Sequence, residues 1–384
     1  MCGVILHSGF DQLKFTLSTD IPPKLRAELA SAKAHAKETH SECVLEFGDI
    51  KLSVSNKGAR GFTAHTGDHG AIWLFQDPED RIPNNPGITI DFRAFGLATG
   101  GLEGAEQHFR DCMTAFGIPY VETQLRVARA DFAVDFLAPW FEPDRDALVV
   151  PPGTKITEYT GVAETATVAS GSRVVGLRAG AVANRQLAIY DKRAEIMQQN
   201  KMGWLTIWNA ALADLNKPPL DLKNRDESQV WRFELRLGSK QLRNRFEMRS
   251  WEDVHNTIGD AFTDALSRMR YCLPTTDRNR ARWPVHGLWA QFESVIDNDL
   301  LVNCSGVLPS DVIKANRIAK MRELDAQLLG LLITRAVLSG VGSAKFSQFA
   351  AGHSVSLARL VEEDPQALEI KIERARTKYC FALK

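Results

Sequence analysis

Several familiar signals are missing from this sequence. Its six cysteines stand singly, without a CxxC pair, which excludes a zinc ribbon and a disulfide-framed miniprotein. No apolar run approaches the roughly 18–20 residues that a membrane helix needs, and no secretory leader is indicated. Neither GxGxxG nor GxxxxGKS/T occurs, so no separate ATPase domain is indicated. A soluble cytoplasmic protein is therefore the expectation.

A net charge is also missing, because 47 Lys and Arg balance 47 Asp and Glu. That balance excludes a polybasic protein that coats DNA indiscriminately, although it allows a local basic face. Residues 223–249 contain eight Lys or Arg against four acids, and residues 268–282 contain five Arg against one acid. Each segment therefore has a net charge of +4, and aromatic residues interleaved with these charges suit phosphate contacts combined with base stacking.

The 384 residues allow two or three domains, and a composition of 44% apolar and 24% charged residues indicates a globular protein. The clearest strand patterns lie at residues 87–98, 125–137, 185–192 and 230–238. Helical periodicity alone follows residue 251. We therefore predict an α+β domain at residues 1–273, with a central antiparallel sheet and flanking helices, in two β-rich halves of about 1–120 and 121–273. A helical C-terminal domain is predicted at residues 274–384.

Alternation sorts three of these strands into an apolar and a polar face. The polar faces together gather these side chains: Asp131, Asp135, Tyr190, Lys192, Arg232, Glu234 and Arg236. The strand near residues 88–92 adds Asp91, although its two faces are less distinct. Carboxylates that share one face of a sheet need cations between them, and hard oxygen ligands of this kind suit Mg²⁺ or Mn²⁺.

Two interpretations of this polar face stay open. In the first, it is a metal-assisted phosphodiester site. The metal polarises a phosphate oxygen, Tyr190 attacks the phosphorus, and Lys192 or an arginine stabilises the developing charge. In the second, the polar side chains face solvent and form surface ion pairs.

Three segments carry a resemblance to a known family. They read RADFAVDF (residues 129–136), GLRAGAVANRQLAIYDKRAE (176–195) and WRFELRL (231–237). In this order they resemble the Rep_trans family, the rolling-circle replication initiators of small plasmids and related filamentous-phage replication proteins. The matching residues are Arg129, Asp131, Asp135, Gly176, Arg178, Asn184, Arg185, Tyr190, Asp191, Lys192, Trp231, Arg232 and Glu234.

The resemblance implies a sequence-specific nicking and closing endonuclease that initiates rolling-circle DNA replication. Tyr190 would be the nucleophile, keeping the 5′-phosphate and freeing a 3′-OH, and Lys192 would assist it. Asp131 and Glu234 would be ligands of Mg²⁺ or Mn²⁺, with Asp91 as a third acid. The arginines expected to contact DNA are Arg129, Arg178, Arg185, Arg232 and Arg236.

Many rolling-circle nickases bind metal through a His-hydrophobic-His strand, which this sequence lacks. The expected fold is therefore HUH-nuclease-like without the His motif. Because the tyrosine of the His-type enzymes lies on a later helix, Tyr271 is the reserve candidate for the nucleophile.

The expected partner is origin DNA, double-stranded with an extruded single-stranded nick site, in the cytoplasm of a bacterial host. A host helicase and polymerase are further expected partners, and the helical domain would contribute origin binding or a homodimer contact. A DNA-binding regulator and a mobile-element relaxase on the same fold are the alternatives.

Overall fold

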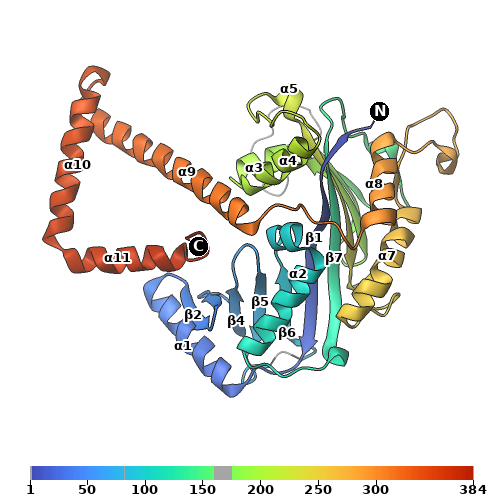
Figure 1. Ribbon diagram of the computed structural model, residues 1–384, viewed down its shortest axis with the longest axis horizontal. Helices are drawn as coiled ribbons and strands as arrows, with labels where there is room; N and C mark the ends of the chain where they lie inside the picture. The colour runs from blue at the N-terminus through green and yellow to red at the C-terminus, as the bar shows by residue number, and fades with distance from the viewer. Residues whose placement is uncertain (1, 82, 160–174, 384) are drawn as a thin grey trace. The chain divides into compact units, whose positions relative to one another are not determined.

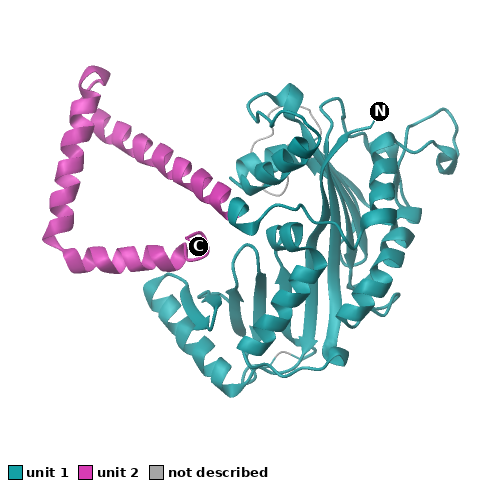
Figure 2. Cartoon of the chain, viewed as in Figure 1, with its two compact units in different colours: residues 1–312 teal, residues 313–384 magenta. Residues whose placement is uncertain are grey.

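The structure is a computed structural model, and it describes residues 2–81, 83–159 and 175–383. The chain forms two compact units, residues 1–312 and 313–384 (Figure 2). As predicted, the fold is α+β, with a large antiparallel sheet and flanking helices in the first unit (Figure 1).

Eleven strands of the described residues form this sheet, in the order β2-β3-β4-β5-β6-β1-β7-β12-β11-β10-β9. Their bounds are β1 Val4–Ser18, β2 Cys43–Phe47, β3 Ile50–Val54, β4 Gly61–His65, β5 Ala71–Gln76, β6 Gly87–Phe92, β7 Leu125–Leu137, β9 Ile156–Tyr159, β10 Gly176–Ala181, β11 Arg185–Asp191 and β12 Val230–Gly238. The short strands β8 (Leu148–Val149) and β13 (Arg270–Tyr271) pair separately. Because the long strand β1 pairs with both β6 and β7, it joins the first five strands to the rest of the sheet.

The helices of the first unit are α1 Pro23–Thr39, α2 Ala94–Ala115, α3 Lys192–Gln198, α4 Gly203–Asp214, α5 Arg225–Ser228, α6 Ser239–Leu242, α7 Trp251–Arg268 and α8 Gly287–Asp299. Three longer helices follow, α9 Pro309–Leu338, α10 Phe346–Glu363 and α11 Pro365–Lys378. Residues 192–214 form two helices, α3 and α4, rather than one. The chain turns between them at Asn200, whose φ is 52°.

The central strands β7 and β12 are buried on both faces. On one face, Phe132 and Phe233 contact Phe262 of α7 and Phe292 of α8. On the opposite face, Trp208 of α4 belongs to a second apolar cluster that includes the start of α2. Because successive side chains of a strand point to opposite faces, the apolar series of β12 faces α7 and α8, and its charged series lies on the side of α3 and α4.

The two units divide between residues 312 and 313, later than the boundary predicted near residue 274. The reason is α8, because Trp289 and Phe292 pack against Phe233 and so belong to the core of the first unit. In the second unit, large apolar side chains such as Leu328 and Leu338 are exposed. Within the described part of the chain, no single helix is long and apolar enough to span a membrane. Helix α9 and the segment Ser343–Glu363 meet the length and composition criteria only when they are taken together, and this pair is bent.

Candidate functional site

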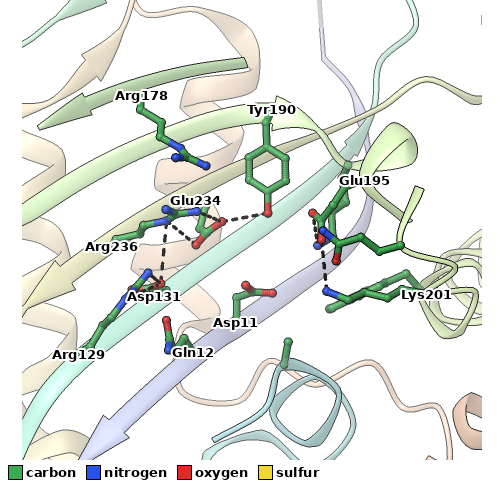
Figure 3. Close-up of a pocket in the computed structure, with 14 residues that line it drawn as sticks. Asp11, Gln12, Arg129, Asp131, Arg178, Tyr190, Glu195, Lys201, Glu234 and Arg236 are labelled. Atoms are coloured by element: carbon green, nitrogen blue, oxygen red, sulfur yellow. Dashed lines mark hydrogen bonds and ion pairs between the residues drawn. The ribbon is translucent and has the colours of Figure 1, made fainter. Parts of the chain in front are cut away.

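A polar pocket of about 320 Å³ lies where β1, β7, β11 and β12 meet the residues of α3 and α4 (Figure 3). We name it the Tyr190 pocket. Its lining residues are Asp11, Gln12, Ala94, Arg129, Asp131, Arg178, Tyr190, Lys192, Glu195, Gln199, Lys201, Trp204, Glu234 and Arg236. Five of these side chains are basic and four are acidic, and the surplus of cations suits an anionic ligand such as phosphate.

Strand pairing brings the predicted site residues together. Tyr190 of β11 lies opposite Arg232 of β12, which in turn lies opposite Asp135 of β7. In the same way, Arg236 lies opposite Asp131. Because residues i and i+4 of a strand share a face, both rows are on the same side of the sheet. The pocket thus follows from alternation in three neighbouring strands.

The hydroxyl of Tyr190 donates a hydrogen bond to Oε2 of Glu234 at 3.1 Å. Arg236 donates two bonds to the same carboxylate, from Nε to Oε1 at 2.7 Å and from Nη2 to Oε2 at 3.1 Å. Burial, reinforced by the charge of Glu234, raises the pKa of Tyr190 well above its usual value, so the side chain is a neutral phenol at pH 7. Its proton is directed at a carboxylate, which is the geometry of a nucleophile beside a general base.

Asp131 is the second carboxylate of the pocket and is almost completely buried. Arg129 donates to it from Nε to Oδ1 at 2.9 Å and from Nη2 to Oδ2 at 2.6 Å. Burial raises the pKa of Asp131 to about 8, with Arg129 opposing the rise and Glu234 adding to it. At neutral pH Asp131 therefore keeps its proton.

Arg232 is fully buried next to the pocket. Its Nε and Nη2 donate to Asp135 at 2.6 and 2.8 Å, and its Nη1 pairs with Asp11. Trp208 also donates to Asp135, at 2.9 Å, and the guanidinium carbon lies 4.4 Å from the ring centroid of Trp204. The sequence predicts that Arg232 contacts DNA. Its position corrects this, because a side chain with no exposed surface supports the pocket from behind and is not available to phosphate.

Several pocket residues are missing from the sequence prediction. Burial opposes the ionisation of Asp11, yet Arg232 and Lys192 lower its pKa to about 2. Lys192 Nζ lies 2.8 Å from Oε2 of Glu195, and Lys201 Nζ lies 3.6 Å from its Oε1. The i,i+3 spacing of Lys192 and Glu195 was the available signal for this pair, but it has meaning only once a helix is known to begin at Lys192.

Lys192 is the first residue of α3, where sequence alternation predicts the end of a strand. The side chain of Asp191 caps this helix by accepting a backbone N–H. Lys192 Nζ lies 5.7 Å from the ring centroid of Tyr190 and 5.1 Å from that of Trp204. Arg178 projects from β10 toward Tyr190 (Figure 3). Both cations therefore line the same pocket as Tyr190.

Besides Arg232, two predicted residues are not among those that line the pocket. Asp91 accepts a hydrogen bond from Nε2 of Gln12 at 2.7 Å and pairs with Lys14 at 3.0 Å. Arg185, predicted to contact the same DNA site, pairs with Asp264 of α7 at 3.4 Å. Since α7 covers the apolar face of the sheet, Arg185 is on the side away from Tyr190.

Tyr271, the reserve nucleophile, is buried on the apolar side of the sheet. Its oxygen accepts the backbone N–H of Asp144 at 2.7 Å, and its ring packs against Phe141 and Phe233. Burial raises its pKa as well. The geometry therefore favours Tyr190 over Tyr271.

The predicted metal ligands do not converge in this arrangement. Asp131 and Glu234 are each bound to an arginine, and Asp91 is bound to Lys14. Across the described residues, no group of three His, Cys, Asp or Glu side chains is arranged to hold a metal ion. Because Mg²⁺ needs about six oxygen ligands in near-octahedral geometry, this donor set does not fit it as arranged. The site for Mg²⁺ or Mn²⁺ stays a prediction.

The fold and the pocket define an α+β protein that holds a tyrosine and paired carboxylates among cations on a large antiparallel sheet. No family model matches the chain, and no curated protein does. A solved structure of a rolling circle replication initiator protein from Geobacillus stearothermophilus is similar, with a TM-score of 0.39 and 14% identity, over 77% of this chain and 98% of that chain. At these values the similarity establishes neither a family nor the role of any residue.

Proposed function

We propose that this chain is a replication initiation protein for rolling-circle DNA replication, a sequence-specific endonuclease that nicks and rejoins one strand at the origin. The strongest support is the hydrogen bond from Tyr190 to Glu234 within a pocket that contains five basic side chains. Phosphodiester transfer needs a nucleophile, a proton acceptor and positive charge around the phosphate. In the Tyr190 pocket we assign these roles to Tyr190, Glu234 and the five basic side chains.

In the proposed reaction, the oxygen of Tyr190 attacks the phosphorus while its proton passes to Glu234. A phosphotyrosine ester forms, and the bond from the phosphorus to the 3′ oxygen breaks. Asp131 donates a proton to that oxygen, because its raised pKa keeps it protonated at neutral pH. Arg236 and Lys192 stabilise the charge that develops on the phosphate. The reverse sequence rejoins the strand without ATP, since the ester conserves the energy of the broken bond.

The test uses the full chain and a supercoiled plasmid that carries the DNA flanking its gene. The expected result is a nicked circle and a DNA–protein adduct in which the 5′-phosphate is attached to Tyr190. Tyr190→Phe abolishes the adduct, and Tyr271→Phe, a matched removal of a buried hydroxyl, retains it. An adduct that persists in Tyr190→Phe, or that depends on Tyr271, overturns the proposal.

A second candidate is a DNA-binding regulator that uses the same pocket without cutting. The observation that favours it is the burial of Tyr190, which is 9% exposed and has a raised pKa. A phenol held in this state is a poor nucleophile unless Glu234 removes its proton. This candidate predicts salt-dependent DNA binding with no nicked circle at any pH, including when Mn²⁺ is added.

A further inference from the structure

A second hollow, of about 480 Å³, is lined in part by β1 and β7, two of the strands that also line the Tyr190 pocket. We name it the Arg126 pocket. Its lining residues are Thr16, Ser18, Asn84, Asn85, Pro86, Arg126, Val127, Ala128, Ser239 and Arg243. Thr16 shares the polar face of β1 with Gln12 of the Tyr190 pocket, since the intervening Leu13 and Phe15 are in the core.

The lining of the Arg126 pocket is unusual in charge, because it contains two arginines and no carboxylate. Arg126 is held by the backbone carbonyls of Thr123 and Leu125, and Arg243 donates to the side chain of Asn244. Neither guanidinium has an ion-pair partner within residues 2–81, 83–159 and 175–383. Hydroxyl and amide groups from three separate segments complete the lining. Such a set of donors without an acid suits an anion, and phosphate above all.

Strand register connects the two pockets. Asp131 lies opposite Gln12, Arg129 opposite Lys14, and Arg126 opposite Thr16, so three successive rows run along β1 and β7. Five residues separate Asp131 from Arg126, which at about 3.3 Å per residue is about 16 Å of strand. Arg129 lies between the pockets and lines the first of them. A polar path with basic groups therefore leads from Tyr190 to Arg243.

We infer that the Arg126 pocket binds a phosphate of the same DNA strand whose scissile phosphate lies at Tyr190. This inference rests on the proposed function. A separation of this size corresponds to a few nucleotides of the strand. The lining of the Arg126 pocket contains no aromatic side chain on which a base could stack, and its two arginines suit a contact to the DNA backbone. The pocket fixes the direction and register of the single strand on the sheet.

The experiment measures binding of fluorescein-labelled single-stranded dT20 by the full chain across a series of salt concentrations, by fluorescence anisotropy. In the double variant Arg126→Gln/Arg243→Gln, affinity falls at least about ten-fold. The slope of log K against log salt becomes shallower by about 0.7, because one phosphate contact on a single strand contributes about 0.7. The charge-matched control Arg60→Gln/Arg110→Gln, whose exposed arginines lie outside both pockets and outside the two basic segments, keeps the wild-type slope. Arg126→Lys/Arg243→Lys keeps most of the affinity and shows that the loss follows charge.

An unchanged slope in a double variant with the wild-type thermal transition overturns the inference. A loss of affinity for a blunt hairpin duplex with none for dT20 overturns it too, because the pocket would then bind duplex DNA. Formation of the covalent Tyr190 adduct is measured in a separate assay, on the supercoiled plasmid that carries the DNA flanking the gene. If the adduct forms and the slope is unchanged, the inference fails and the proposed function stands. If no adduct forms and the slope changes as expected, the pocket assignment stands as a DNA contact and the nicking proposal fails.

Discussion

Arg232 and Asp135 form a two-bond ion pair in which both side chains are completely buried, with Nε–Oδ1 and Nη2–Oδ2 distances of 2.6 and 2.8 Å. The pair lies opposite Tyr190 in the strand register, and Arg232 reaches on to Asp11 at the edge of the pocket. Two charges removed from water in this way are tolerated only as a bonded pair. The pair therefore fixes the position of β12 relative to β7, and with it the position of Glu234.

Removing one partner of this pair should destabilise the protein strongly. Arg232→Met leaves Asp135 buried with Trp208 as its one remaining side-chain donor among the described residues, and we expect the free energy of unfolding to fall by about 3–5 kcal/mol. The double variant Arg232→Met/Asp135→Leu should lose clearly less than the sum of the two single variants, since neither charge is then left alone. Urea denaturation measures the free energy of unfolding of the two single variants and of the double variant. Additive losses would show that the two side chains do not stabilise each other.

Glu234 should control the pH dependence of the proposed reaction. Burial raises the pKa of Tyr190, so below that pKa the phenolate fraction grows about ten-fold for each unit of pH. The wild-type protein does not depend on this fraction, because Glu234 takes the proton during attack. In Glu234→Gln we expect the rate of adduct formation at pH 7 to fall by about 10²–10⁴ and to rise steeply with pH up to about 8, above which Asp131 loses the proton that it donates to the leaving oxygen.

The matched control for this prediction is Glu195→Gln, which neutralises a carboxylate of the same pocket that bonds Lys192. Its adduct rate should keep the shallow wild-type pH profile. If Glu234→Gln had the same profile as wild type, Glu234 would not be the proton acceptor.

The sequence predicts those parts of the site that depend only on the alternation of side chains within one strand. Alternation in β12 places Glu234 and Arg236 on one face, and the antiparallel sheet predicted from such strands is confirmed. Asp11 could not be found in this way, because it reaches the pocket only through the long-range pairing of β1 with β7. Nor could alternation separate Arg232 from Arg236. Both are on the charged face, and packing against Trp204 of α4 decides that only the first is fully buried.

Asp131 should make stability depend on pH above neutrality. Burial raises its pKa to about 8 from 3.8, so the folded protein keeps a proton that the unfolded chain loses between these values. Stability therefore falls as pH rises through this range. His7 acts in the opposite direction at lower pH, because burial lowers its pKa from 6.5 to about 4. Of these two groups, only Asp131 changes stability between pH 6.5 and 8. Over this range we expect the free energy of unfolding to fall by about 1–2 kcal/mol.

This pH effect is measured by urea denaturation in chelator-containing buffer at pH 6.5, 7.25 and 8. Asp131→Asn, which cannot ionise, should remove the slope in this window even if the variant is less stable overall. His7→Gln should leave it intact. A slope that survives in Asp131→Asn would mean that another group titrates there and that Asp131 is already ionised at neutral pH.

Metal dependence separates the roles of Asp91 and Asp131. The sequence predicts both as ligands of Mg²⁺ or Mn²⁺, but Asp91 is bound to Gln12 and Lys14 and does not line the pocket. We expect Asp91→Asn to leave the Mn²⁺ concentration that gives half-maximal nicking within about two-fold of wild type. Asp131→Asn, which removes a carboxylate beside Glu234, should lower nicking at every Mn²⁺ concentration, because the proposed proton donor is lost. Nicking of supercoiled plasmid across a Mn²⁺ titration, with a chelator control, measures both variants. A large rise in the required Mn²⁺ for Asp91→Asn would show that this acid joins the site when DNA is bound, as the sequence alone predicts.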